Sequence, residues 1–237
     1  MSLNELKFEN FAHQAREFSI LKGRMNMELA ELVNPKHTVV ITMEMQRGIV
    51  GDLSSFPELR DAAADSGVLS NGPVICNAAR EAGVRVLHAI AVNRADHAGS
   101  KANCRMLAAS EKINQSGSGL VENSEGAELV SSFGPEPEDI VVPRLHGLTP
   151  FTSTALDQII RNLDTQTVVA LGVSLNIGVI GLAMSAVDLG YQVVIPTDAV
   201  TGVPIEYGQR ILQGSLSLLA SLTSTEDLVR IWETYQT

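Results

Sequence analysis

The chain of 237 residues is long enough to bury a sizeable core, and we expect one main domain. With 45% hydrophobic and 19% charged residues, its composition is that of a globular protein rather than a disordered one. A net charge of −10 without a basic cluster argues against nucleic acid and membrane partners. Because no basic segment leads into an apolar run and no stretch has the length of a membrane span, a cytoplasmic protein is expected.

The first 35 residues mix apolar and charged side chains without a clear strand pattern. We expect residues 1–35 to form an N-terminal extension that packs on the domain or on a partner subunit, and residues 36–237 to form the domain. Residues 37–43 are the first β-branched run, which is typical of a central strand and ends at Glu44.

A helix is predicted next, because Pro73 marks a typical first helical position and apolar residues then recur at helical spacing until Gly83. Residues 84–92 form the second predicted strand. Residues 93–120 form a long polar connection. Such connections are uncommon unless they cover a site, so a lid or pocket wall is expected there.

The second half of the sequence continues this alternation. Further strands are predicted at residues 139–143, 168–172, 191–196 and, as a short edge strand, 220–223. Helices are predicted after Thr154, at residues 177–189 and at residues 204–219, with a final turn that Thr225 caps and that contains Trp232. Alternating strands and helices predict a doubly wound parallel α/β sheet with right-handed crossovers.

Three strands end in residues that could act together. Glu44 follows the first strand, Arg144 follows the third, and the turn from Ser174 to Gly178 follows the fourth. The carboxyl ends of parallel strands share one edge, where ligands bind, so these residues are expected to converge. Neither a dinucleotide fingerprint nor a Walker phosphate loop is present, and no cofactor is expected.

The motifs at these strand ends resemble the isochorismatase-like (cysteine hydrolase) superfamily. They are Thr-Met-Glu-Met-Gln-Arg-Gly at 42–48, Val-Val-Pro-Arg at 141–144, Pro-Phe-x-x-Thr-x-Leu at 150–156, Gly-Val-Ser-Leu-Asn-Ile-Gly at 172–178, and the segment 190–199. The resemblance covers roughly residues 37–223. It implies a six-stranded, three-layer, Rossmann-like parallel sheet with helices on both faces, in a homo-dimer, homo-tetramer or other homo-oligomer.

The same resemblance implies a catalytic triad of Asp, Lys and Cys. This sequence has Glu44, Arg144 and Gly178 at those positions. Because glycine offers no nucleophile, amide hydrolysis through a thiolate is not expected. The family also implies another route, since its isochorismatases can carry Gly at the cysteine position and use the acidic residue as proton donor to a vinyl ether.

The sequence therefore suggests a carboxylate mechanism. Burial beside apolar neighbours would favour Glu44 as a neutral acid, whereas Arg144 would favour the carboxylate, and both remain open. Arg144 is expected to grip a substrate carboxylate, or else only to neutralise Glu44. His146 could supply acid–base chemistry or bond to the backbone of its loop.

The remaining candidates also have two interpretations each. Asn176, beside Ser174, could bind a substrate oxygen or cap the following helix. Gly178 could leave space for a ligand or could reflect close helix packing. Cys104 could replace the lost nucleophile, whereas Cys76 is expected to pack in a helix. Asp96-His97 resembles a metal-binding loop of some nicotinamidases, but no second nearby histidine completes a ligand set, so no metal is expected.

The predicted function is a hydrolase that acts on a small, anionic, carboxylate-bearing molecule without a cysteine nucleophile. The alternative is a catalytically inactive pseudoenzyme that binds a metabolite or a protein partner through the same pocket.

Overall fold

The computed structural model describes residues 28–115 and 119–236. The chain divides into two units, residues 1–32 and residues 33–237. Of the first unit, only residues 28–32 are described, and they include the short helix α2 (Leu29–Leu32). Most of the predicted N-terminal extension, 1–35, therefore lies outside the described residues. Its packing stays a prediction.

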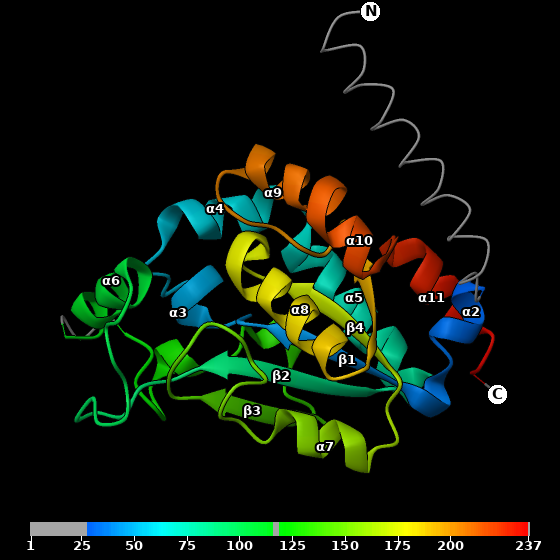
Figure 1. Ribbon diagram of the computed structural model, residues 1–237, viewed down its shortest axis with the longest axis horizontal. Coiled ribbons are helices and arrows are strands. Elements are labelled where there is room, and N and C mark those ends of the chain that lie inside the picture. The colour runs from blue at the N-terminus through cyan, green and yellow to red at the C-terminus, as the bar shows by residue number, and fades with distance from the viewer. Residues whose placement is uncertain (1–27, 116–118, 237) are drawn as a thin grey trace, which may run out of the picture. The chain divides into compact units, whose positions relative to one another are not determined.

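The second unit is built on a parallel sheet of six strands in the order β3-β2-β1-β4-β5-β6 (Figure 1). The strands are β1 (Thr38–Met43), β2 (Arg85–Ala91), β3 (Ile140–Arg144), β4 (Thr167–Gly172), β5 (Gln192–Pro196) and β6 (Ser221–Thr223). The central strands β1 and β4 are buried along their whole length, as expected for continuous apolar runs covered on both faces. The predicted doubly wound six-stranded α/β fold is confirmed.

Helices cover both faces of this sheet, with α8 in front of it and α5 behind it in Figure 1. The α-helices are α3 (Arg47–Val50), α4 (Pro57–Asp65), α5 (Val68–Glu81), α6 (Arg105–Ile113), α7 (Leu156–Asn162), α8 (Ile180–Asp188), α9 (Ile205–Ile211), α10 (Ser217–Leu219) and α11 (Thr225–Glu233). Shorter 3₁₀ and π turns are η1 (Pro35–His37), η3 (Glu125–Ala127), η4 (Ser131–Phe133), η5 (Leu175–Val179) and η6 (Leu212–Leu216). None of the helices in the described part of the chain is long and apolar enough to cross a membrane.

The start of α5 differs from the prediction. The helix begins at Val68, after Gly67 at a φ of 82°, and Pro73 lies inside it rather than at its first turn. Gly72 packs against the ring of Phe133, where an added Cβ would lie 2.5 Å from ring atoms. The Gly-Pro pair therefore reflects tertiary packing and not a helix start.

The last helix also differs from its prediction. It is a helix of nine residues, α11, and its N-cap is Ser224, whose hydroxyl accepts the N–H of Asp227. Thr225 is the first helical residue, and its N–H and hydroxyl donate to the Asp198 carboxylate. Trp232 is fully buried on α11, and its indole N–H donates to the carbonyl of Val33 at 2.9 Å.

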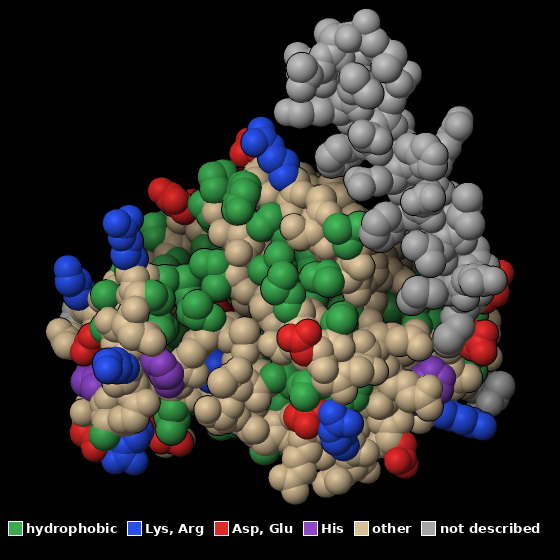
Figure 2. All heavy atoms as spheres, viewed as in Figure 1, with side chains coloured by type: hydrophobic (Ala, Val, Ile, Leu, Met, Phe, Trp, Pro, Cys, Tyr) green, Lys and Arg blue, Asp and Glu red, His purple; other side chains and the backbone are tan. Residues whose placement is uncertain are grey.

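Hydrophobic side chains gather over α8, α9 and α10 on the face shown in Figure 2. Among the most exposed are Met184, Tyr207 and Leu218. The expected homo-dimer or homo-tetramer stays a prediction, because the structure describes one chain.

A polar network is buried between β1, β2 and the segment that enters β3. The fully buried ring of His88 lies 2.7 Å from the Thr42 hydroxyl through Nδ1 and 3.1 Å from Asp139 through Nε2. Arg80 also binds Asp139, at 2.7 Å. A neutral imidazole with its proton on Nε2 satisfies both contacts, because it accepts from Thr42 and donates to Asp139.

This network shifts two pKa values in the same direction. Burial lowers the pKa of His88 and outweighs the opposing effect of Asp139. Burial alone would raise the pKa of Asp139, but hydrogen bonds from Arg80, the Glu136 backbone and His88 outweigh it, and this pKa is lowered. The folded protein therefore binds fewer protons in acid than the unfolded chain.

We predict an acid-sensitive fold. The stabilising contribution of neutral His88 is complete above its ordinary pKa of 6.5 and is lost as the pH falls below that value, whereas the contribution of Asp139 is lost in stronger acid. The melting temperature should fall from about pH 7 to about pH 5, and it should fall less in the His88→Gln variant. Thermal unfolding followed by circular dichroism checks this, and equal falls in both proteins would contradict it.

A second prediction concerns Gly172, which ends β4 at a φ of 109°, where an added Cβ would lie 2.4 Å from the carbonyl oxygen of Met43. Gly83 has a similar φ of 80° but nothing within 4 Å of such a Cβ. Gly172→Ala should therefore lower the unfolding free energy by about 2 kcal/mol or more beyond Gly83→Ala, because only the former adds a backbone clash. Urea denaturation measures the unfolding free energy of both variants. Similar losses would contradict the prediction, because they would show that the backbone relieves the contact with Met43 easily.

Candidate active site

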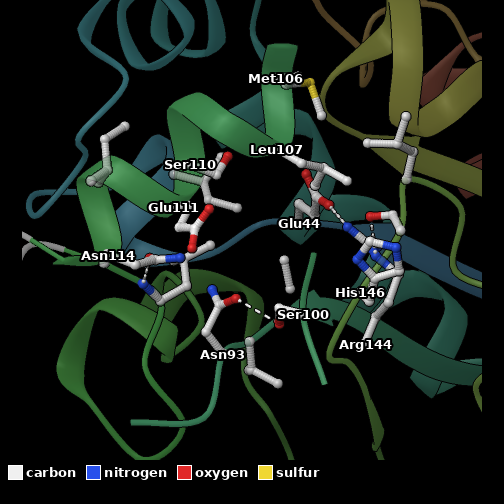
Figure 3. A pocket seen from close by; sticks show the side chains of 18 of the residues that line it. Glu44, Asn93, Ser100, Met106, Leu107, Ser110, Glu111, Asn114, Arg144 and His146 are labelled. Atoms are coloured by element: carbon white, nitrogen blue, oxygen red, sulfur yellow. Dashed lines mark hydrogen bonds and ion pairs between the residues drawn. The ribbon is translucent and has the colours of Figure 1, made fainter. Parts of the chain in front are cut away.

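A pocket of about 220 Å³ lies at the carboxyl ends of four neighbouring strands (Figure 3). Glu44 follows β1, Asn93 follows β2, Arg144 ends β3 and Ser174 follows β4, and all four line the pocket. The chain reverses its direction of travel across the sheet at β1, between β2 and β4. The pocket is therefore at the topological switch point, where ligands bind in open α/β sheets.

Glu44 lies in an uncommon backbone conformation at the centre of this edge. Its φ is 55°, in the left-handed region, while its N–H donates to the carbonyl of Ala89 at 2.9 Å. For a residue other than glycine this conformation costs on the order of 1–3 kcal/mol, and such residues concentrate at functional sites. The Glu44 side chain is 18% exposed and points toward Arg144 (Figure 3).

Arg144 forms an ion pair with Glu44. Its Nη2 donates to the Glu44 carboxylate, its Nε donates to the carbonyl of Gly147 at 3.0 Å, and its side chain is only 6% exposed. Its Nη1 is buried and has no hydrogen-bond partner in the part of the chain that the structure describes. Two donors of the guanidinium are thus bound to the protein, and the grip on a substrate carboxylate expected for Arg144 stays a prediction.

His146 and Lys101 line the pocket beside this pair. The N–H of Lys101 donates to His146 Nδ1 over a long 3.4 Å, and the Ser100 hydroxyl donates to the carbonyl of Leu145 at 2.7 Å. These bonds join the loop after β3 to the segment after β2. Within residues 28–115 and 119–236, Lys101 forms no ion pair.

The structure separates Ser174 from Asn176. Ser174 lines the pocket and donates its hydroxyl to Asn176 Oδ1 at 2.9 Å. Asn176 is not a lining residue, and its amide instead reaches the carbonyl of Val203 at 3.4 Å. It makes no helix-capping bond either, so it holds the Val203 segment, a role that the sequence did not indicate.

Gly178 lines the pocket, but the position of its missing side chain is filled. An added Cβ would lie 2.9 Å from Met43 Cε and 3.1 Å from the carbonyl oxygen of Val173. Met43 itself is fully buried. Of the two interpretations open in the sequence, the structure shows close packing at this glycine.

We predict that Met43 and Gly178 are energetically coupled. Gly178→Ala should destabilise the fold by about 1–3 kcal/mol through overpacking, whereas Met43→Ala leaves a cavity. The double variant should lose at least about 0.5 kcal/mol less unfolding free energy than the two single variants lose together, because the smaller residue at position 43 makes room for the Cβ added at position 178. Denaturant unfolding of the four proteins measures this, and strict additivity would contradict the contact.

Helix α6 forms one wall of the pocket through residues at helical spacing. They are Met106, Leu107, Ser110, Glu111, Ile113 and Asn114. The segment before α6 adds His97, Ser100, Lys101 and Ala102. The prediction that residues 93–120 form a pocket wall is confirmed for the described residues of this range.

Neither cysteine is placed to act in the pocket. Cys104 is exposed at the start of α6 and is not a lining residue. Cys76 is buried in α5, and burial raises the pKa of its thiol to about 12. A thiolate is the nucleophilic form, so the described residues offer no activated thiol here.

Gln46 was not singled out in the sequence, yet it holds the pocket together. Its fully buried amide donates to the carbonyls of Ala91 and Ala127 at 2.9 and 3.0 Å, and its Oε1 accepts the N–H of Ala91 at 2.8 Å. The side chain thereby continues the β1–β2 pairing beyond the strand ends. Its position shortly after the first predicted strand, between Met45 and Arg47, was the only sequence signal for this role.

The loop with Asp96 and His97 holds no cluster of metal ligands. Asp96 pairs with Arg94 at 2.8 Å, and His97 lines the pocket. Across the described residues, no three His, Cys, Asp or Glu side chains are grouped so that they could hold a metal ion. The expectation of a reaction without metal or cofactor stays a prediction.

Together, these features define a doubly wound α/β protein with a carboxylate–guanidinium pair in a pocket at its switch point. Comparison with protein families completes the assignment. The chain belongs to the isochorismatase family, because the model of the isochorismatase domain matches residues 38–227.

The relatives agree with this assignment. The chain is 30% identical to the uncharacterized isochorismatase family protein YwoC of Bacillus subtilis (strain 168) over 138 residues. This matched region is 58% of this chain and 70% of YwoC. A cysteine hydrolase from Pseudomonas syringae pv. phaseolicola 1448A has a TM-score of 0.72 at 22% identity, over 86% of this chain and 96% of its own. The N-carbamoylsarcosine amidase from Thermoplasma acidophilum has a TM-score of 0.60 at 20% identity, over 80% and 97%. At these identities the solved structures show a shared fold.

Proposed function

We propose that this protein is a hydrolase that acts on a small carboxylate-bearing metabolite through Glu44, without a cysteine nucleophile. The observation that carries the proposal is that the carboxylate of Glu44 lines the pocket in which Gly178 stands, at the carboxyl ends of the strands. The left-handed backbone of Glu44 supports it, because strain of this kind concentrates at active sites.

The ion pair favours Glu44 as a general base. As a carboxylate, it accepts a proton from a water molecule whose oxygen bonds to the electrophilic carbon of the substrate. The protonated Glu44 then returns that proton to the leaving group, and the bond to the leaving group breaks. With a vinyl ether the order reverses: the protonated side chain gives its proton to the terminal carbon, and water adds to the oxocarbenium carbon and returns a proton to Glu44. The hemiketal then collapses, its C–O bond breaks, and a carbonyl compound and an alcohol are released.

Lys101 is the best candidate for holding the substrate carboxylate. It is a cation in the lining, and Arg144 already donates to Glu44 and Gly147. His146 lies next to Lys101, since its Nδ1 accepts the Lys101 N–H. In this arrangement Arg144 is a positioning residue, and Lys101 and His146 face the ligand.

We predict that Glu44→Gln lowers kcat by roughly 100-fold or more, because an amide cannot accept or return the proton. The measurement is a hydrolysis assay over small amides, ureides and a vinyl ether such as isochorismate. Glu58→Gln, on the exposed first turn of α4 and outside the pocket, is the matched control and should retain activity. Full activity of Glu44→Gln on a substrate found in this way would sink the proposal.

The alternative is a pseudoenzyme that binds a metabolite or protein partner through the pocket. The mutual engagement of Glu44 and Arg144 favours it, because the pair neutralises itself within the protein. Saturable binding of panel compounds without turnover of any of them would support this alternative.

A further inference from the structure

Most of α6 faces the pocket rather than the protein core. None of its residues is buried, yet it carries three large apolar side chains, Met106, Leu107 and Ile113, and all three line the pocket. Met106 is 40% exposed. An apolar face that a helix does not use for its own packing indicates a surface that covers something else.

Three more apolar side chains line the pocket. They are Ile49 of α3 and Phe56 and Leu59 at the start of α4. We call these three residues and the three of α6 the apolar wall. In Figure 3, Leu107 projects from α6 toward Glu44, so the wall adjoins the proposed reactive carboxylate.

The polar groups of the pocket do not surround this wall evenly. Lys101, Arg144 and His146 gather with Glu44 at the strand ends, as the bonds between these segments show. Ser110 and Glu111 are the polar lining residues of α6, and the Oδ1 of Asn114, which follows the helix, accepts the N–H of Leu120 at 2.9 Å. A ligand therefore meets charge at the strand ends and mainly carbon along the wall.

We propose that the substrate is amphiphilic, with a carboxylate and the reacting bond at the strand ends and a short aliphatic or aromatic body against the apolar wall. This inference rests on the proposed function and names its substrate class. The volume limits the size, because a cavity of about 220 Å³ lies below the range of about 300–1,000 Å³ that is usual for drug-sized ligands. The aliphatic or aromatic body is therefore short.

The test uses two series of simple probes, straight-chain alkanoates and the matching alkanamides, from two to about eight carbons. Binding to the full-length protein is measured by isothermal titration calorimetry. Each methylene buried against the wall should tighten binding about fourfold, and the gain should end within the series, at the length that fills the cavity.

Leu107→Asn should flatten this dependence on chain length. Because α6 contains no buried residue, this variant should remain folded, which its melting temperature verifies. Leu218→Asn is the matched control, since Leu218 is 65% exposed on α10 and lies outside the pocket. It should keep the full dependence.

The inference holds if the alkanoates show the chain-length gain and Leu107→Asn removes it, and its carboxylate is wrong if the gain appears with the alkanamides alone. It is overturned if neither series binds, if affinity does not depend on chain length, or if Leu107→Asn leaves the dependence intact. The proposed function fails separately. A chain-length gain without turnover of any panel compound supports the amphiphilic ligand and contradicts the hydrolase function. Turnover confined to short polar substrates supports the hydrolase function and contradicts the amphiphilic substrate.

Discussion

The ion pair between Glu44 and Arg144 is the interaction on which the site depends. It joins the ends of β1 and β3 across β2, and each partner is mostly withdrawn from water. A buried charge without its partner is costly, so each residue fixes the position of the other. Lys101 and the apolar wall are then arranged around a carboxylate of fixed orientation.

The sequence predicts the sheet and the converging strand ends well, because buried parallel strands are continuous apolar runs and their carboxyl ends share an edge. Glu44, Arg144 and Ser174 meet in the pocket for that reason. What depends on contacts between distant segments could not be predicted. Gly72 packs on Phe133 inside α5 and does not mark its start. Asn176 bonds to Ser174 and to the Val203 carbonyl and does not line the pocket.

Gly178 shows why a substitution has to be interpreted with its neighbours. In the sequence, the glycine raises the question of whether a ligand occupies the space of the missing side chain. In the structure, Met43 occupies that space, so the two residues form one packing arrangement. In the proposed function the reactive group is therefore the carboxylate of Glu44, which directly follows β1 and is held in place by Arg144.

The claim that Arg144 works through Glu44 is tested most directly by a double-mutant cycle in kcat/KM. Glu44→Gln, Arg144→Gln and the double variant would be compared on one substrate. Residues that act as a unit give non-additive losses, so the double variant should be no worse than the more damaged single variant. Losses that multiply would contradict the account and would show that Arg144 binds the substrate independently.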